Sequence, residues 1–158
     1  TYLPTTGKPT LAGVEGVAIL RSLGEGYGLP GLRMGLVVAT GQLRERLDTA
    51  RTSWGLSVPE AAVGEHCLRQ DGFLEESRER IDEERERLRA RLETRFDLTA
   101  EGVFLRLETD SPKEIAADLR DQGLLVADGS DHTGMENRIV VTLRTPPEND
   151  RLLEALGV

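Results

Sequence analysis

The chain has 158 residues, enough for one domain with a hydrophobic core and too few for two ordinary domains. Its 28 acidic and 20 basic residues give a net charge of −8, which argues against nucleic acid or an anionic membrane as a partner. The single Cys67 excludes an internal disulfide, and no apolar run approaches the roughly 20 residues of a membrane span. We therefore expect a cytoplasmic globular protein in a reducing compartment.

The first third of the chain predicts an irregular arm and two strands joined by a glycine-rich loop. Residues 1–16 contain glycine and proline without periodicity and look cut from something larger. The apolar runs 17–20 and 34–39 predict two strands. Because neither run alternates with polar residues, we expect a sheet that is covered on both faces.

The middle of the chain predicts three helices, over residues 42–53, 58–70 and 71–96. The second has Ser57 as its N-cap and Glu60 three residues later, which is the capping-box pattern. The third has apolar residues along one face and dense charge on the other. We interpret that charge as a solvated helix face rather than a binding surface.

The last third predicts a compact α+β module with short elements. Alternation of apolar and polar residues over 103–107 indicates a half-buried strand, and Ser111 followed by proline opens a helix. The remaining predicted elements are two strands and a closing helix, over residues 124–127, 138–143 and 146–156.

The glycine-rich stretch 22–35 carries the most specific signal in the sequence. Glycines allow a backbone to approach a ligand closely, and a serine with an arginine suits a phosphate or sulfate. The stretch resembles the lysine motif of fold-type I, class I/II pyridoxal-phosphate (PLP) aminotransferases, S-x-[ST]-K-x-[FY]-G-[LI]-x-G-x-R-x-G. Ser22 and Arg33 match the two ligands of the cofactor phosphate, and Tyr27 matches the aromatic position. Glu25 stands at the position of the Schiff-base lysine, and Gly24 replaces the serine or threonine before it.

The resemblance extends to both ends of the chain. The run that begins at Arg138 resembles the family ending, in which this arginine holds the substrate carboxylate. Residues 123–134 resemble the branch of histidinol-phosphate aminotransferases and threonine-phosphate decarboxylases. Tyr2 matches the end of the family's D-E-x-Y, whose tyrosine touches the cofactor. The resemblance thus implies Ser22, Arg33 and Tyr2 as cofactor ligands, and Arg138 with Tyr27 as substrate ligands.

The resemblance implies an α/β fold that corresponds to the C-terminal part of the aminotransferase fold. We expect a remnant of the large domain with its anion loop over 1–57, connecting helices over 58–98, and a small α+β domain over 99–158. The family's glycine-rich phosphate loop and the Asp that pairs with the pyridinium nitrogen have no counterpart in the sequence. A separate chain that supplies the N-terminal half, in a hetero-oligomer, is the partner we expect.

The replacement of the lysine limits the chemistry. A carboxylate forms no imine, so Glu25 is either drift in a dead pocket or a group that accepts a proton or binds an ammonium. His132 is a second catalytic candidate, with Asp131 or Glu25 to orient it. We expect no cofactor, or PLP bound without a covalent link.

Three functions are compatible with these residues. The first is a subunit of a lysine-less enzyme of bacterial secondary metabolism. An example of its chemistry is amine cyclisation to an aziridine or azabicycle amino acid in azinomycin-type pathways. The substrate would be amino-acid-like, free or attached to a carrier protein. The second is a non-catalytic stabilising or regulatory subunit, and the third is a C-terminal fragment of an ordinary PLP enzyme.

Overall fold

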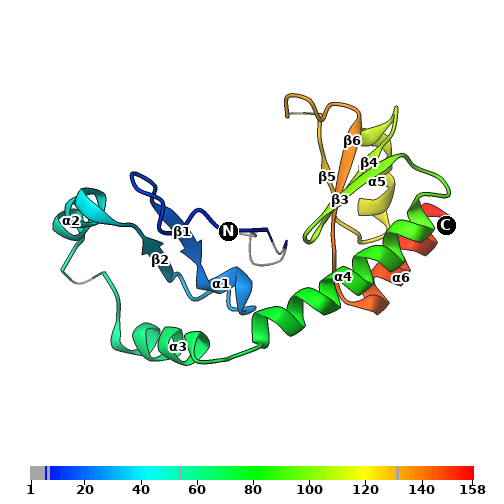
Figure 1. The fold of residues 1–158 in the computed structure, drawn as a ribbon. Helices are drawn as coiled ribbons and strands as arrows, with labels where there is room; N and C mark the ends of the chain where they lie inside the picture. The colour runs from blue at the N-terminus through cyan, green and yellow to red at the C-terminus, as the bar shows by residue number, and fades with distance from the viewer. Residues whose placement is uncertain (1–5, 7, 54, 131) are drawn as a thin grey trace. The chain divides into compact units, whose positions relative to one another are not determined.

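The computed structural model of the chain describes residues 6, 8–53, 55–130 and 132–158. It forms two compact units, residues 1–78 and 79–158, and the division falls within the long helix α4 (Phe73–Leu92) (Figure 1). Each unit is described by itself below.

The first unit is built around a two-stranded antiparallel ribbon. Strand β1 (Ile19–Ser22) pairs with β2 (Gly35–Val38), and the register runs from Ile19 opposite Val38 to Ser22 opposite Gly35. Between the strands lies the one-turn helix α1 (Leu23–Gly26), which the sequence analysis did not predict. Helices α2 (Gly41–Ala50) and α3 (Val58–Leu68) follow.

The expectation that these two strands are covered on both faces is wrong for this chain. Leu20 of β1 is 73% exposed and Val37 of β2 is 54% exposed, and α2 has no buried residue. An apolar run in a sequence indicates that the strand is buried when its fold is complete. No other element of the described chain supplies that burial here.

Helix α3 supplies what core the first unit has. Its N-terminus has the predicted capping box, in which Glu60 accepts a hydrogen bond from the Ser57 amide and the Glu60 amide donates to the Ser57 hydroxyl. Gly64 is buried against the Met34 side chain, so closely that a Cβ atom there would displace it. Cys67 is 4% exposed, as expected of a small buried hydrophobic residue.

The second unit contains a four-stranded antiparallel sheet in the order β3-β4-β6-β5. Its strands are β3 (Leu98–Glu101), β4 (Phe104–Glu108), β5 (Ala127–Asp128) and β6 (Arg138–Thr142). Besides α4, its helices are α5 (Pro112–Asp121) and α6 (Pro146–Leu156).

Alternation along the two central strands separates a core face from an open face. Leu105 and Leu107 of β4 are fully buried, and so are Ile139 and Val141 of β6, at 2% exposure or less. Leucines from three helices complete the core: Leu88, Leu92, Leu119, Leu152, Leu153 and Leu156. The half-buried character predicted for β4 is therefore confirmed.

The predicted elements of the second unit differ from the structure mainly at their ends. Helix α6 has the predicted bounds, because Thr145 and Glu148 form a capping box at its start and Gly157, at φ +71°, ends it. Strand β5 has two residues instead of four. Strand β3 was missed because its sequence, LTAE, lacks a run of strand-forming apolar residues.

Two structural findings bear on the kind of function. None of the helices within the described residues is long and apolar enough to span a membrane. In the same part of the chain, no group of three or more histidine, cysteine and carboxylate side chains is arranged to hold a metal ion.

Candidate functional site

The glycine-rich loop of the first unit folds back on itself around Ser22. The Ser22 hydroxyl caps α1 by accepting a hydrogen bond from the Gly24 amide at 3.2 Å. The Leu29 amide donates to the Gly24 carbonyl at 2.6 Å, and the Leu23 amide donates to the Met34 carbonyl at 3.1 Å. These bonds bring both ends of the loop to the one-turn helix that carries Glu25.

Gly24 stands where the family motif has serine or threonine. A Cβ atom on Gly24 would lie 2.9 Å from the Leu29 carbonyl oxygen and 3.3 Å from the Pro30 Cα. Both neighbours are backbone atoms, so a side chain at this position would require the loop to move. The loop of this chain is therefore closed in a way that excludes the family's second hydroxyl.

The Glu25 carboxylate is only partly hydrogen-bonded. Its Oε2 atom is buried and has no hydrogen-bond partner among the described residues. The Ser22 hydroxyl lowers the pKa of the Glu25 carboxyl below its ordinary value of 4.5, and the Glu25 backbone amide and the Arg33 charge act in the same direction. The carboxylate is therefore ionised at neutral pH.

Ser22 and Glu25 are three residues apart at the start of a helix, in the S-x-x-E pattern of a capping box. The reciprocal bonds of a capping box are not formed among the described residues, because the Ser22 hydroxyl accepts from the Gly24 amide rather than from the Glu25 amide. The contact that Glu25 makes at the start of α1 is the one with the Ser22 hydroxyl, which lowers its pKa. That contact was not predicted from the sequence, because the one-turn helix was not predicted.

Arg33 and Tyr27 complete the predicted residues of this loop. The Arg33 side chain is exposed, and its charge is close enough to lower the pKa of Glu25. The Tyr27 ring stacks on Phe73, with 5.4 Å between the ring centroids and 15° between the planes. Burial raises the pKa of the Tyr27 hydroxyl, and the nearby Cys67 adds to the effect. The structure thus brings Ser22, Glu25 and Arg33 together in one loop.

Arg138 belongs to the second unit, at the start of β6 on the open face of the sheet. It lies directly opposite Glu108 of β4, and its guanidinium donates to the Glu108 carboxylate from Nε, at 3.1 Å, and from a terminal nitrogen. The group predicted to hold a substrate carboxylate thus holds a carboxylate of its own chain. Sequence reasoning missed Glu108, because the two residues are 30 positions apart and only the strand register joins them.

The structure says less about the two remaining predicted site residues, His132 and Tyr2. His132 is exposed in the turn before β6, where its amide donates to the Gly129 carbonyl at 2.9 Å. Asp131, the proposed partner of His132, and Tyr2, the proposed cofactor ligand, lie outside the described residues.

Covalently attached PLP requires donors for its phosphate and an amine that forms the imine. Ser22 and Arg33 are donors of the type that binds a phosphate, and Gly24 leaves no room for a further hydroxyl. Glu25 is a carboxylate with a lowered pKa, which forms no imine. The loop therefore does not fit covalently attached PLP.

Comparison with known proteins places these residues in a wider context. The family model for aminotransferase class I and II matches residues 4–156. Histidinol-phosphate aminotransferase 1 of Archaeoglobus fulgidus is 35% identical over 144 residues, which are 90% of this chain and 44% of that protein. Histidinol-phosphate aminotransferase 2 of the same organism is 29% identical over 141 residues, 87% of this chain and 41% of that protein. The chain thus spans less than half the length of these curated relatives.

Solved structures show the same fold. Histidinol-phosphate aminotransferase from Clostridium acetobutylicum matches with a TM-score of 0.86 and 17% identity, over 98% of this chain and 50% of that one. L-threonine-O-3-phosphate decarboxylase from Porphyromonas gingivalis matches with a TM-score of 0.83 and 20% identity, over 99% and 52% of the two chains. These matches confirm the predicted α/β fold, and a coverage of about half is consistent with the C-terminal part of it.

Proposed function

Because this chain belongs to the class I and II aminotransferase family, we propose that it is one subunit of a heteromeric enzyme that uses the family's fold without Schiff-base chemistry. One observation carries the proposal. Glu25 stands at the lysine position of the motif, while Ser22 and Arg33 of the same motif are retained in the same loop. A pocket that had lost all function has no need of the exposed arginine.

A separate chain that supplies the rest of the fold is the partner in this proposal. The chain spans less than half of its curated relatives, and the first unit exposes apolar side chains along both strands. An exposed apolar face of this kind marks a surface that another chain covers. A complementary half that packs on β1 and β2 would bury these side chains and enclose the loop.

The chemistry that these residues support best is closure of a ring by an amine. The amine nitrogen of an amino-acid-like substrate attacks a carbon that carries a sulfate or phosphate. The new N–C bond forms as the C–O bond breaks, and the electron pair leaves with the oxyanion. The proton released from nitrogen passes to a carboxylate or to water. Ser22 and Arg33 would bind the leaving anion, and Glu25 would hold the ammonium form of the substrate and accept a proton from it, because only the neutral amine has the lone pair that attacks the carbon.

The pKa of Glu25 sharpens that role. A general base works best when its pKa is close to the operating pH, and the Ser22 hydroxyl moves the pKa of Glu25 away from neutrality. A carboxylate of this kind orients a cationic amine well and is a weak base. We therefore assign Glu25 to orienting the amine and to accepting its proton, and keep His132, which belongs to the second unit, as a separate catalytic candidate.

The complex itself provides the first test. The tagged chain, purified from its native cells, should carry a second polypeptide that contains the missing part of the fold, visible in a native mass spectrum. The same sample should show no visible absorption band of a lysine–PLP imine. A chain that purifies as a well-behaved monomer would contradict the proposal.

Two variants of the complex separate binding from turnover. Arg33→Lys keeps the charge but loses the two-pronged geometry of the guanidinium, so it should weaken binding of the anionic substrate by about 2–5 kcal/mol. Glu25→Gln keeps the shape and the hydrogen bonds but loses the charge, so it should lower the rate by about 100-fold or more with the anion still bound.

The second candidate function, a non-catalytic stabilising or regulatory subunit, is favoured by two contacts. Arg138 is already paired with Glu108, and Glu25 already contacts the Ser22 hydroxyl that caps α1. If Arg33→Lys and Glu25→Gln both assemble and leave the activity of the complex unchanged, this second function replaces the first. The third possibility, a fragment of an ordinary PLP enzyme, requires that Glu25→Lys form an imine once the other half is supplied.

A further inference from the structure

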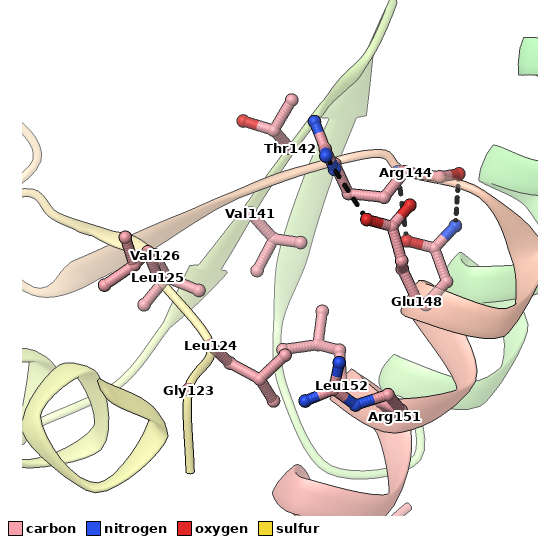
Figure 2. Close-up of a pocket in the computed structure, with 11 residues that line it drawn as sticks. Gly123, Leu124, Leu125, Val126, Val141, Thr142, Arg144, Glu148, Arg151 and Leu152 are labelled. Atoms are coloured by element: carbon pink, nitrogen blue, oxygen red, sulfur yellow. Dashed lines mark hydrogen bonds and ion pairs between the residues drawn. The ribbon is translucent and has the colours of Figure 1, made fainter. Parts of the chain in front are cut away.

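A groove of about 490 Å³ lies in the second unit, between the segment that follows α5, the end of β6 and the first turns of α6 (Figure 2). This volume is in the range of small-molecule sites, roughly 300–1,000 Å³. The lining combines an apolar floor with polar groups at its edges, as Figure 2 shows for Leu124, Val126, Val141 and Leu152 on one hand and for Arg144 and Arg151 on the other.

The groove exists because β5 is short. Strand β5 pairs with β6 only through Ala127 opposite Val140 and Asp128 opposite Ile139. The segment 124–126 therefore runs beside the end of β6 without continuing the ladder, and Leu125 within it is 82% exposed. An apolar surface that the fold could have closed with one more strand pair is left open.

The end of β6 presents a backbone donor to this space. The Leu143 amide donates to the Val103 carbonyl at 2.7 Å, so Leu143 directs its backbone groups toward β4. Hydrogen-bonding direction alternates along an antiparallel strand, so Thr142 directs its amide and carbonyl to the opposite side, where β5 has already ended. Thr142 lines the groove.

The charged groups leave a positive charge uncompensated. Arg144 forms an ion pair with Glu148 at 3.2 Å, and the Glu148 carboxylate also accepts a hydrogen bond from the Thr145 hydroxyl at 2.5 Å. Arg151 forms no ion pair within the described part of the chain. A ligand with an apolar chain and one carboxylate would compensate Arg151 and cover the apolar floor.

We propose that this groove is a binding site for an amphipathic monocarboxylate. The apolar chain lies on Leu124, Val126, Val141 and Leu152, the carboxylate pairs with Arg151, and the Thr142 amide donates to a ligand oxygen. Arg138 lies at the opposite end of β6, about 13 Å away at the usual rise per strand residue. The groove is therefore a site in addition to the one discussed for Arg138.

The test uses the full chain fused to a soluble carrier protein, so that aggregation of the exposed first unit does not interfere. The probe is an octanoate analogue that carries a photoreactive diazirine, and the labelled peptides are mapped by mass spectrometry. Label should appear in peptides that contain residues 123–126 or 141–152. Unlabelled octanoate should compete for it, whereas octylammonium and acetate should not, because each lacks one half of the recognition.

Variants tie the label to the groove. Arg151→Gln should reduce labelling at a fixed probe concentration by about tenfold, the effect of losing a charged hydrogen bond. Arg91→Gln, which removes another exposed arginine outside the groove, should leave it unchanged. The proposal is overturned if no label forms, or if the label maps to other peptides. It is also overturned if labelling survives Arg151→Gln, or if octylammonium displaces the probe as well as octanoate does.

Discussion

The two units of this chain distribute their apolar side chains in opposite ways. Among the described residues, twelve of the fourteen buried hydrophobic side chains belong to the second unit, and twelve of the thirteen exposed large ones belong to the first. Burial of apolar surface is the main favourable term in folding. The second unit therefore has its own core, whereas the first consists of secondary structure whose apolar surface is still available to another chain.

The largest expected effect concerns independent folding. A fragment that begins at Gly72 and contains α4 with the whole second unit should be monomeric and should unfold in one cooperative thermal transition, because its core is complete. Residues 1–71 alone should aggregate or show no such transition. Circular dichroism with size-exclusion chromatography measures both. If residues 1–71 alone melt cooperatively as a monomer, the contrast between the two units is wrong.

Matched leucine truncations sharpen the same contrast. Leu107→Ala in the second unit should lower the free energy of unfolding by about 2–5 kcal/mol, because Leu107 is fully buried in the core. Leu20→Ala in the first unit should change it by less than about 0.5 kcal/mol, because Leu20 is 73% exposed. Urea titration of the chain measures the two values.

For association with the complementary half, Leu20 should matter more than Leu107. Leu20→Ala should lower the association constant measurably, whereas Leu107→Ala should lower the free energy of unfolding without a direct effect on the contact between the two chains. If Leu20→Ala leaves the association constant unchanged, the exposed face of β1 is not where the other half binds.

Local signals explain why parts of this contrast were predictable from sequence and others were not. The N-cap Thr145, the prolines after it and Gly157 lie within or beside α6, so its bounds could be read directly. The strands around the loop were located, but the exposure of their side chains depends on what packs against them, which no local pattern states. The pairing of Glu108 with Arg138 depends on the register of β4 and β6, which no local pattern states.

The same distinction holds for the candidate site. Ser22, Glu25 and Arg33 were predicted because they share one short motif, and the structure places them in one loop. The contact between Glu25 and the Ser22 hydroxyl at the start of α1 was missed because the glycines in Leu23–Gly26 disfavour a helix, and only the fold shows that one turn forms.

A smaller effect is expected at the polar contact that joins α4 and α6 in the second unit. The Asn149 side chain is 1% exposed; its amide nitrogen donates to Glu84 at 2.7 Å and to the Arg144 carbonyl at 2.8 Å, and its oxygen accepts from the Arg144 amide at 3.0 Å. Asn149→Ala leaves these partners unsatisfied and should cost about 1–3 kcal/mol of unfolding free energy. Asn137→Ala, at an exposed asparagine, is the control. Equal costs for the two variants would show that the contact does not stabilise the unit.

The smallest expected effect is a pH dependence that belongs to the second unit. The Arg87 guanidinium, which donates to the Glu84 carboxylate at 2.7 Å, lowers the pKa of Glu84 below its ordinary value of 4.5, and the Asn149 amide adds to this. Because the pKa is lower in the folded chain than in the unfolded chain, the stabilisation is fully present above about pH 4.5 and is lost as the pH falls through the lowered value. Glu84→Gln should therefore flatten the decline of stability between about pH 5 and pH 3, and Glu83→Gln, an exposed neighbour, should not. Thermal unfolding of the fragment that begins at Gly72, followed across this range, gives the slopes; parallel curves for the parent and Glu84→Gln would mean that the ion pair has no net effect on folding.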